Sequence, residues 1–427
     1  MTYSSNYLRL LSLTKQLTSH VNQGRHEQAL ALFHHMQTSP SLALDPFVFP
    51  LVLKSCAAIH HPQLGTSIHA YAVKSAFLSN PFVACALVDM YGKCGSVSAA
   101  RQLFDEIPLR NVVAWNAMIS IYTHFGHVND ALELFGSMDF VPNESSFNAI
   151  MAGLVGLENG AFRAIVLYRR MQECGLKPNL ITILALLPAC VGVAALSLIK
   201  EVHCYAIRNG MDPNIQLRSC LVEAYGRCGC LFNAHNVFYS MRERDVVAWS
   251  SLISAYALHG EARTALEIFR QMEMARVWPD DITFLGVLKA CSHAGVADEA
   301  LYYFDRMHKD YGMRASADHY SCLVDALSRA GRLHEAYKVV QEMPLKATAK
   351  TWGALLGACR TYGEVELAEI AGRALFEIEP NNAANYVLLE KIYASLGRYE
   401  EAERMRRGMK ERGIKSAPGS SWIVHQD

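Results

Sequence analysis

The hydrophobic residues of this chain recur in a short pattern that is typical of one buried helical face. Ala29, Phe33 and Met36 occupy positions i, i+4 and i+7, which lie on the same side of an α-helix. The same alanine, aromatic and methionine spacing returns in full from Ala131, Ala164, Ala234, Ala265 and Ala300, and more loosely from Ala100, Ala336 and Ala402. Each copy predicts a helix that carries a small residue where a neighbouring helix packs closely.

A glycine precedes these alanines at a nearly constant distance. It lies five residues before the alanine in eight of the nine copies, namely Gly24, Gly95, Gly126, Gly229, Gly260, Gly295, Gly331 and Gly397, and four residues before it at Gly160. Glycine suits a tight turn because it adopts positive φ without strain. Another apolar helical stretch, such as residues 115–122, precedes each glycine. The repeating unit is therefore predicted to be helix, turn, helix.

A longer period of 134 residues also runs through the chain. It separates Trp115 from Trp249, Cys94 from Cys228 in matching Tyr-Gly-(Lys/Arg)-Cys-Gly segments, and His69 from His203. This distance is about four units, so units of different kinds follow one another in a fixed order. Helical pairs that cannot bury an apolar face alone stack into a solenoid with an extended concave surface. We therefore expect an all-α solenoid.

The units resemble those of one known repeat family. A tetratricopeptide array would show a regular 34-residue period with Trp and a Gly-Tyr pair in its first helix, whereas these units vary from 31 to 36 residues. Their endings, such as Gly-Leu-Lys-Pro-Asn179 and Arg-Val-Trp-Pro-Asp280, and their Val-Val-Ala-Trp-Asn116 opening resemble plant pentatricopeptide repeats of the PLS type, which mixes long, short and standard motifs. The resemblance implies a right-handed superhelical solenoid of α-helix pairs.

The resemblance divides the chain into three parts. Residues 1–9 would belong to a transit peptide, residues 10–348 to the repeat array, and residues 349–427 to an E region of two degenerate, tetratricopeptide-like repeats with a short tail. The array contains units 10–45, 46–80, 81–111, 112–143, 144–179, 180–214, 215–245, 246–280, 281–316 and 317–348. The marks of the E region are Thr-Trp352-Gly-Ala-Leu-Leu-Gly-Ala-Cys359, Asn385-Tyr-Val-Leu-Leu and Pro418-Gly-Ser-Ser-Trp422. These features are similar to the E subgroup that lacks the DYW deaminase domain.

In this family the fifth and last residues of a unit select one base of a single-stranded RNA. Short polar side chains on a rigid helix can bond to the exposed edge of an unpaired base. By resemblance, Asn116 with Asn143 and Asn148 with Asn179 would select pyrimidines, with a preference for cytidine. Ser219 with Asp245, Ser250 with Asp280 and Thr14 with Asp45 would select guanosine. The implied RNA reads, 5′ to 3′, G, two unread positions, two pyrimidines, one unread position, then G-G.

Other units depart from this pattern, and a second interpretation of the polar residues exists. Pro50, Cys85, Leu184 and Leu285 hold the fifth position and are predicted not to bond to a base edge, while Ser321 with Thr348 permits no assignment. Asn, Ser and Asp at helix starts are also ordinary caps. Because four units place suitable residues at both positions, we favour base contact over capping alone.

Catalysis and metal binding find no support in the sequence. A zinc deaminase needs His-x-Glu and Cys-x-x-Cys, but the single His-x-Glu, at His259 and Glu261, lies on a predicted turn, and no Cys-x-x-Cys occurs. Cys228-Gly-Cys230 has the wrong spacing, and most histidines lie singly on predicted helices or turns. No phosphate-binding glycine loop or nucleophile motif is present. We expect neither an enzyme nor a bound cofactor or metal.

Charge and composition set further limits. The net charge is zero, so binding to nucleic acid would depend on local groups and not on general attraction to phosphates. The first acidic residue is Glu27, which follows a Ser/Thr-containing stretch with three basic residues, as in an organellar transit peptide. The twelve cysteines are expected to be reduced, since no secretory signal is evident.

One apolar segment has the length of a membrane span. Residues 180–199 carry no charge, but Pro188 and Gly192 interrupt them. The segment Leu-Leu-Pro-Ala-Cys190 also recurs elsewhere, as Val-Leu-Lys-Ser-Cys56, Val-Leu-Lys-Ala-Cys291 and Leu-Leu-Gly-Ala-Cys359. A repeat helix is therefore predicted, and no membrane is expected among the partners.

The leading functional hypothesis is a site-recognition factor for C-to-U editing of organellar RNA. The repeats would hold single-stranded RNA, and the E region would recruit a DYW-type deaminase or another protein of the editing complex. We expect a mitochondrial location, with the chloroplast as the alternative. Two other hypotheses remain open, a protein–protein scaffold that binds no RNA and an RNA-binding factor for transcript stability or splicing.

Overall fold

The computed structural model describes residues 2–39, 42, 44–108 and 110–414. Across these ranges it contains twenty-four α-helices and one short 3-10 helix, with no β-strand. The chain forms two compact units, residues 1–198 and residues 199–427, and their boundary falls within helix α12 (Leu196–Arg208).

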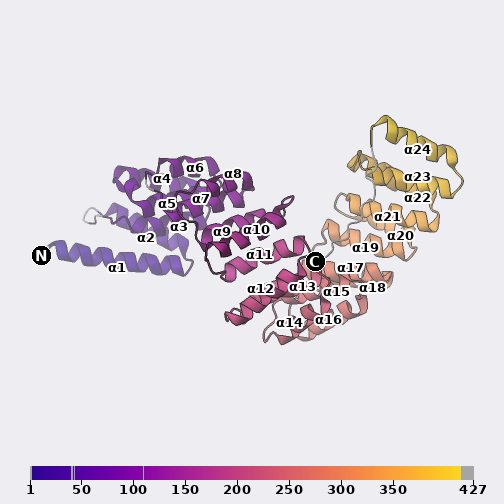
Figure 1. Ribbon diagram of the computed structural model, residues 1–427, viewed down its shortest axis with the longest axis horizontal. Helices are drawn as coiled ribbons and strands as arrows, with labels where there is room; N and C mark the ends of the chain where they lie inside the picture. Colours follow the sequence, from indigo (N-terminus) through magenta and orange to yellow (C-terminus); the bar gives the residue numbers. More distant parts are fainter. Residues whose placement is uncertain (1, 40–41, 43, 109, 415–427) are drawn as a thin grey trace. The chain divides into compact units, whose positions relative to one another are not determined.

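In the first unit the first helices of successive pairs form one layer and the second helices form another (Figure 1). The first helices are α1 (Thr2–Asn22), α3 (Val48–Ala58), α5 (Pro81–Lys93), α7 (Val112–His124), α9 (Glu144–Leu154) and α11 (Leu180–Gly192). The second helices are α2 (His26–Thr38), α4 (Pro62–Lys74), α6 (Val97–Glu106), α8 (Val128–Gly136) and α10 (Gly160–Glu173), and the 3-10 helix η1 (Phe77–Ser79) follows α4. Each first helix from α1 to α9 packs against the next first helix and against its own partner.

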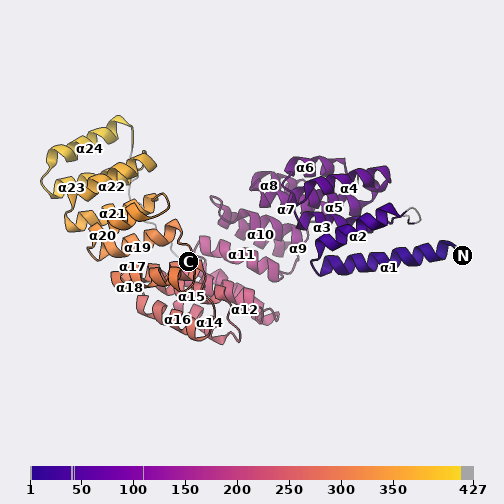
Figure 2. The ribbon, with the colours of Figure 1, turned by 180° about the vertical axis from the view of Figure 1, so that it is seen from behind.

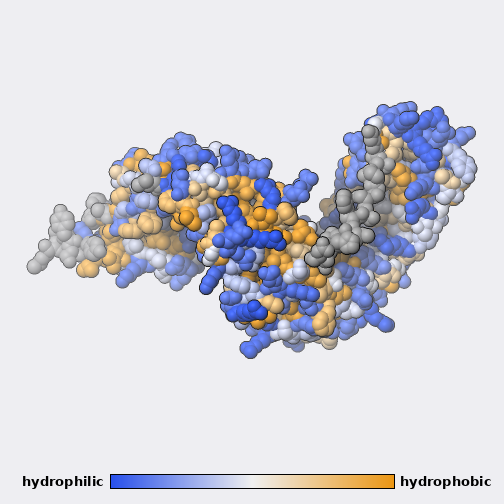
Figure 3. Space-filling model, in the orientation of Figure 1, coloured by the Kyte–Doolittle hydropathy of each residue, from blue (hydrophilic) through white to orange (hydrophobic). Residues whose placement is uncertain are grey.

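The second unit repeats this arrangement (Figures 1 and 2). Its first helices are α13 (Ile215–Arg227), α15 (Val246–Leu258), α17 (Asp281–Ala294), α19 (Ala317–Arg329), α21 (Ala349–Tyr362) and α23 (Ala383–Ser395). The corresponding second helices are α14 (Leu231–Ser240), α16 (Ala262–Met274), α18 (Ala297–Lys309), α20 (Leu333–Glu342), α22 (Val365–Ile378) and α24 (Tyr399–Glu411). Hydrophilic residues cover most of α24 (Figure 3).

The repeated alanines lie in the core. All nine are buried, eight with no exposed surface and Ala402 with 5%. The aromatic residue four positions later packs on the first helix of the following pair. Phe104 and Trp115 have ring centroids 5.1 Å apart, and Phe238 and Trp249, each 134 residues further on, are 4.7 Å apart. Such edge-to-face pairs stabilise by about 0.5–1.5 kcal/mol beyond the area they bury. Residues that are 134 positions apart in the sequence thus make equivalent contacts in the core.

The turn glycines behave as predicted in eight units and differently in one. All eight glycines that lie five residues before an alanine have φ between 67° and 87°. At the ninth unit the turn has two left-handed residues, Gly156 with φ of 88° and Asn159 with φ of 55°, and Gly160 instead begins α10. A Cβ at Gly160 would collide with the carbonyl oxygen of Leu154. Gly160 is therefore needed for space at the start of α10, and the glycine of the turn is Gly156, which lies four residues earlier.

The apolar segment at residues 180–199 is divided between two helices. Helix α11 covers Leu180–Gly192, with Pro188 inside it, and α12 starts at Leu196. In the part of the chain that the structure describes, no helix is long and apolar enough to cross a membrane. The Pro418–Trp422 mark of the predicted E region lies outside the described residues.

Candidate nucleic-acid interface

The last residue of most units caps the first helix of the next unit. These residues have extended backbones, and their side-chain oxygens accept a hydrogen bond from the backbone N–H three residues later, which satisfies one of the free donors at the helix start. Such bonds are made by Asn143 to Ser146 (3.1 Å), Asn179 to Thr182 (3.0 Å), Asp245 to Ala248 (2.8 Å) and Asp280 to Thr283 (2.8 Å). The capping interpretation of these residues is therefore correct.

Three of the five predicted pairs are also brought into direct contact. The hydrogen bonds run from Asn116 Nδ2 to Asn143 Oδ1 (3.1 Å), from Asn148 Nδ2 to Asn179 Oδ1 (3.3 Å) and from Ser219 Oγ to Asp245 Oδ1 (2.8 Å). The fifth residue lies one turn into its helix, and the last residue begins the neighbouring first helix, so packing of adjacent first helices places them together. One side-chain oxygen thus serves both as a cap and as half of a pair.

In two of these pairs the last residue is the more accessible member, whereas Asn116 and Asn143 are both half-buried. Asn148 and Ser219 are buried, with 6% and 1% of their surface exposed, whereas Asn179 and Asp245 are half-buried. The second carboxylate oxygen of Asp245 and the side-chain N–H groups of Asn143 and Asn179 make no hydrogen bond within the described residues. A carboxylate oxygen accepts from the N–H edge of guanine, and an amide donates to the oxygen and ring nitrogen of cytosine. The accessible groups therefore match the predicted bases.

The other two predicted pairs are not joined by a hydrogen bond in the described structure. Asp280 Oδ1 accepts from the Thr283 hydroxyl at 2.6 Å, while the Ser250 hydroxyl donates to the carbonyl of Val247 at 3.2 Å. A hydroxyl at the third position does not by itself prevent a pair, because Thr182 donates to Asn179 Oδ1 at 3.1 Å while Asn148 donates to the same oxygen. At Ser250 and Asp280 both side chains instead have local partners.

The first unit of the array departs further from the pattern. Thr14 donates back to the carbonyl of Leu10 at 2.9 Å, as threonine commonly does within a helix. Asp45 accepts from the backbone N–H of Phe47 at 2.9 Å, and the following helix begins only at Val48. Thr14 and Asp45 thus each have a local partner, so their role as a pair remains a prediction.

Two pairs that the sequence left aside do form contacts. The Cys85 thiol donates to Asn111 Oδ1 at 3.5 Å, and burial raises the pKa of this thiol to about 11, so it stays protonated. A buried thiol is a weak donor, so Cys85 takes part in a pair contact that its residue type did not suggest, while the expectation that it does not bond to a base edge stays a prediction. The Ser321 hydroxyl lies 3.4 Å from that of Thr348. The side chain of Ser321 therefore lies beside Thr348 as that of Ser219 lies beside Asp245.

A row of exposed apolar side chains accompanies the pairs and was missed in the sequence. Each is the second residue of its unit, so it precedes the first buried residue of the first helix. The row contains Phe47, Phe82, Val113, Ile181, Val247 and Ile282, each between 47% and 63% exposed. Phe47 and Phe82, in adjacent units, have ring centroids 6.4 Å apart. The sequence signal for this row is an apolar residue at the second position of a unit, where the helix faces solvent. That signal can be recognised only once the units have been aligned.

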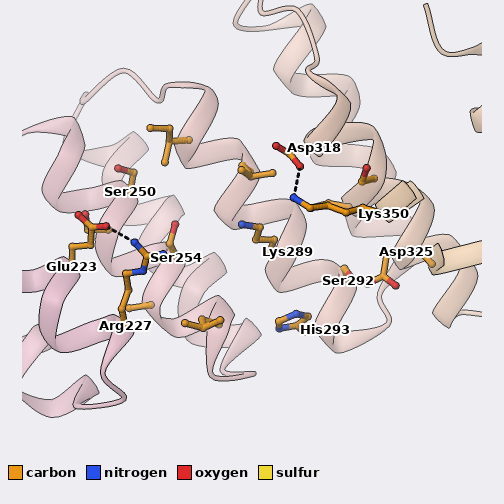
Figure 4. A pocket seen from close by; sticks show the side chains of 18 residues that line it. Glu223, Arg227, Ser250, Ser254, Lys289, Ser292, His293, Asp318, Asp325 and Lys350 are labelled. Carbon is orange, nitrogen blue, oxygen red and sulfur yellow. Dashed lines mark hydrogen bonds and ion pairs between the residues drawn. The ribbon is translucent and has the colours of Figure 1, made fainter. Parts of the chain in front are cut away.

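A groove of about 750 Å³ crosses the first helices α13, α15, α17, α19 and α21 of the second unit (Figure 4). Ser250 and Ile282 line it, so a member of a predicted pair and a member of the apolar row share one surface. Acidic and basic side chains line the groove in equal number. The acidic residues are Glu223, Asp318 and Asp325, and the basic residues are Arg227, Lys289 and Lys350. The described residues contain no group of three or more side chains that could hold a metal ion.

These features define a class of protein, an all-α superhelical repeat protein that presents polar pairs and apolar side chains along the layer of its first helices. Comparison with known proteins supplies the family. Models of the pentatricopeptide (PPR) repeat match residues 83–112, 110–156, 166–228, 219–246, 244–293, 282–311 and 312–344, and the E motif matches residues 362–424. The chain belongs to the pentatricopeptide repeat family, in the PLS-type E subgroup.

Relatives in Arabidopsis thaliana support this assignment. One pentatricopeptide repeat-containing protein is 66% identical over 100% of this chain and 99% of its own length. The chloroplastic protein CRR2 is 38% identical over 94% of this chain and 57% of its own length, and a mitochondrial relative is 36% identical over 98% and 61%. The chain thus spans little more than half the length of the latter two.

A solved structure confirms the fold. The pentatricopeptide repeat protein PPR10 in complex with an 18-nt psaJ RNA element superimposes with a TM-score of 0.71 at 20% identity. The match covers 94% of this chain and 60% of that chain. The all-α superhelical fold expected from the sequence is therefore confirmed.

Proposed function

We propose that this protein binds single-stranded RNA through its side-chain pairs and acts as a site-recognition factor for C-to-U editing in an organelle. The observation that carries the proposal is the repeated contact between a fifth and a last residue, as in Ser219 with Asp245 at 2.8 Å. A cap alone requires no such partner. The buried fifth residue fixes the last residue in one orientation, which leaves one polar group free to meet a base.

The exposed apolar row gives the bases a second kind of contact. Bases have flat apolar faces, and a side chain such as Val113 or Ile282 beside a pair can cover one face while the pair bonds to the edge. Both residues are more than half exposed without RNA. Covering this surface favours binding to any base, whereas the pairs supply the sequence preference.

The editing role rests on the E motif and on the absence of a deaminase motif in the printed sequence. The protein would position a cytidine for a deaminase that another protein supplies. The E-region helices α22 to α24 would form the docking end for that protein. Relatives named as chloroplastic or mitochondrial support an organellar location, and we keep the mitochondrion as the first choice.

Binding to a designed RNA tests the proposal directly. The RNA carries two pyrimidines opposite units 112–143 and 144–179 and guanosine opposite unit 215–245, and a scrambled RNA of equal composition serves as the control. We expect tighter binding to the designed RNA, with crosslinking that falls when Asn116 and Asn148 are changed to Ala. Equal binding to both RNAs would contradict base recognition, and capture of a protein partner without RNA would favour a scaffold.

A loss-of-function line tests the biological role. Sequencing its organellar RNA should show one or a few cytidines that are no longer edited. Altered transcript ends or retained introns with normal editing would instead indicate a role in stability or splicing, and would leave the RNA-binding proposal intact.

A further inference from the structure

One cation on the floor of the groove lacks a partner. Arg227 pairs with Glu223 at 3.2 Å and Lys350 pairs with Asp318 at 3.1 Å, both visible in Figure 4. Lys289, on α17 between these two pairs, makes no ion pair or hydrogen bond to any described residue, and it is exposed. Of the lysines and arginines that line the described groove, it is therefore the one whose charge is not directly balanced.

The acidic residues near Lys289 are already engaged. Asp325 accepts from Arg329 at 2.9 Å and also from the Ser292 hydroxyl. Glu223 and Asp318 are held by the two pairs just described. A carboxylate that already has a cationic partner offers little further attraction to a second cation across the groove. The ammonium group of Lys289 therefore remains free for a negatively charged ligand.

The position of Lys289 recurs in the other half of the chain. Lys54 and Lys289 each lie two residues before a fully buried cysteine, in the Val-Leu-Lys-Ser-Cys56 and Val-Leu-Lys-Ala-Cys291 segments, and Lys54 is likewise exposed without a described ion partner. In the short units the same position holds an acidic residue that forms an i, i+4 ion pair, as in Asp89 with Lys93 at 2.7 Å. The charge is thus neutralised within the short units and left free in these two long units.

These two long units also lack a base-reading pair. Their fifth residues are Pro50 and Leu285, neither of which can donate a hydrogen bond from its side chain. Leu285 and Lys289 are four residues apart, so they follow one another along the same face of α17, and both line the groove. A nucleotide beside this unit would find an apolar contact near its base and a cation one helical turn away.

We propose that Lys289, and Lys54 at the equivalent position, each bind a phosphate of the RNA backbone. The proposal rests on the proposed RNA binding and gives the long units a role there, as backbone contacts between units that read bases. A lysine ammonium is a compact cation with three donors and suits a single phosphate. Because it does not distinguish bases, its contribution should be equal for every RNA sequence.

Salt dependence measures this contact separately from base recognition. Each phosphate contact on a single strand contributes about −0.7 to the slope of log K against log salt. For Lys289→Gln the fall in affinity between about 50 mM and about 200 mM salt should therefore be about 2.6-fold smaller than for the unchanged protein. The same decrease should appear with the designed and the scrambled RNA, and Lys289→Arg should retain the original slope.

A lysine on the outer layer of the same unit provides the matched control. Lys309 lies on α18 and pairs with Asp305 at 2.7 Å. Lys309→Gln removes the same charge from the same unit and should leave the salt slope unchanged. Lys289→Gln should unfold at the same urea concentration as the unchanged protein, since it loses no described contact.

Two results would overturn the inference. One is an unchanged salt slope in Lys289→Gln, and the other is an equal decrease in Lys309→Gln, which would indicate a general effect of net charge. A different result would contradict the proposed function. In that case the unchanged protein would bind the designed and the scrambled RNA with equal affinity, whatever its salt slope.

Discussion

Asp245 combines two roles that substitution can separate. Its Oδ1 caps α15 through the N–H of Ala248 and accepts from the Ser219 hydroxyl, both at 2.8 Å, while its second oxygen is free within the described structure. Asp245→Asn retains a capping oxygen and replaces the free acceptor by an N–H donor. Asp245→Ala removes both. If the pair reads guanosine, the first variant should lose the base preference without loss of stability.

The magnitudes follow from these contacts. Loss of an aspartate cap costs about 0.5–2 kcal/mol of stability. The Ser219 hydroxyl can donate instead to the Ile215 carbonyl, 3.0 Å away, so Asp245→Ala leaves no buried donor without a partner. A side-chain contact to a base edge is worth about 1–3 kcal/mol of discrimination, or about fivefold to 150-fold in affinity ratio. The effect on specificity should thus exceed any effect of Asp245→Asn on folding.

Fluorescence anisotropy with four RNAs that differ only opposite unit 215–245 measures the preference, and urea denaturation measures stability. Asn214→Ala is the matched control, because Asn214 caps α13 through the N–H of Leu217 at 2.9 Å and belongs to a unit whose fifth residue is Leu184. It should lose stability to a similar extent as Asp245→Ala and leave the preference among the four RNAs unchanged.

The reasoning would be refuted if Asp245→Asn kept the full preference for guanosine. It would also be refuted if Asp245→Ala and Asn214→Ala both lowered affinity equally for all four RNAs. Either result would mean that Asp245 is only a helix cap.

Three further predictions concern the scaffold. Phe238→Ala, which removes a fully buried ring from the repeated aromatic contact, should lower the unfolding free energy by about 3–5 kcal/mol in urea titrations, and a loss below 1 kcal/mol would contradict the packing described here. Gly226→Val should destabilise by at least about 1–3 kcal/mol, because a Cβ at this position would collide with that of Ala255 on the adjacent first helix; an unchanged melting temperature would count against so close an approach. Burial lowers the pKa of His203, so the folded protein binds its proton less readily than the unfolded chain, and this contribution to stability is present above the ordinary pKa of 6.5 and lost as pH falls below it. His203→Gln should therefore flatten the acid side of the stability curve, and a curve of unchanged slope would assign that loss to other groups.

Much of the fold could be read from spacing alone. The alanine, aromatic and methionine positions predicted the second helices, and eight of nine turn glycines have the expected positive φ. The 134-residue period predicted equivalent contacts, and His69 with Tyr91 and His203 with Tyr225 indeed form matching hydrogen bonds of 3.1 Å and 3.0 Å. Such features can be predicted from the sequence because helix periodicity and turn chemistry are local. Each repeat also supplies an independent copy of the same pattern.

The site could be predicted only in part, because its contacts form between neighbouring helices and not within one local segment. Positions five and last could be aligned in every unit, but their contact depends on which other hydrogen-bond partners the packed helices offer to each side chain. Asp245 accepts from Ser219, whereas Ser250 donates to the carbonyl of Val247 and Asp280 accepts from Thr283. The thiol of Cys85 was set aside by residue type and yet bonds to Asn111.

The sequence by itself therefore determined the helix pairs, their order and the two positions in each unit that lie near a neighbour, since these follow from local spacing. Only the tertiary structure decided which of those positions meet, which member of a pair stays accessible, and which groove cation is left without a partner. Those outcomes depend on competition for hydrogen bonds and charge between adjacent packed helices, which a linear pattern does not contain.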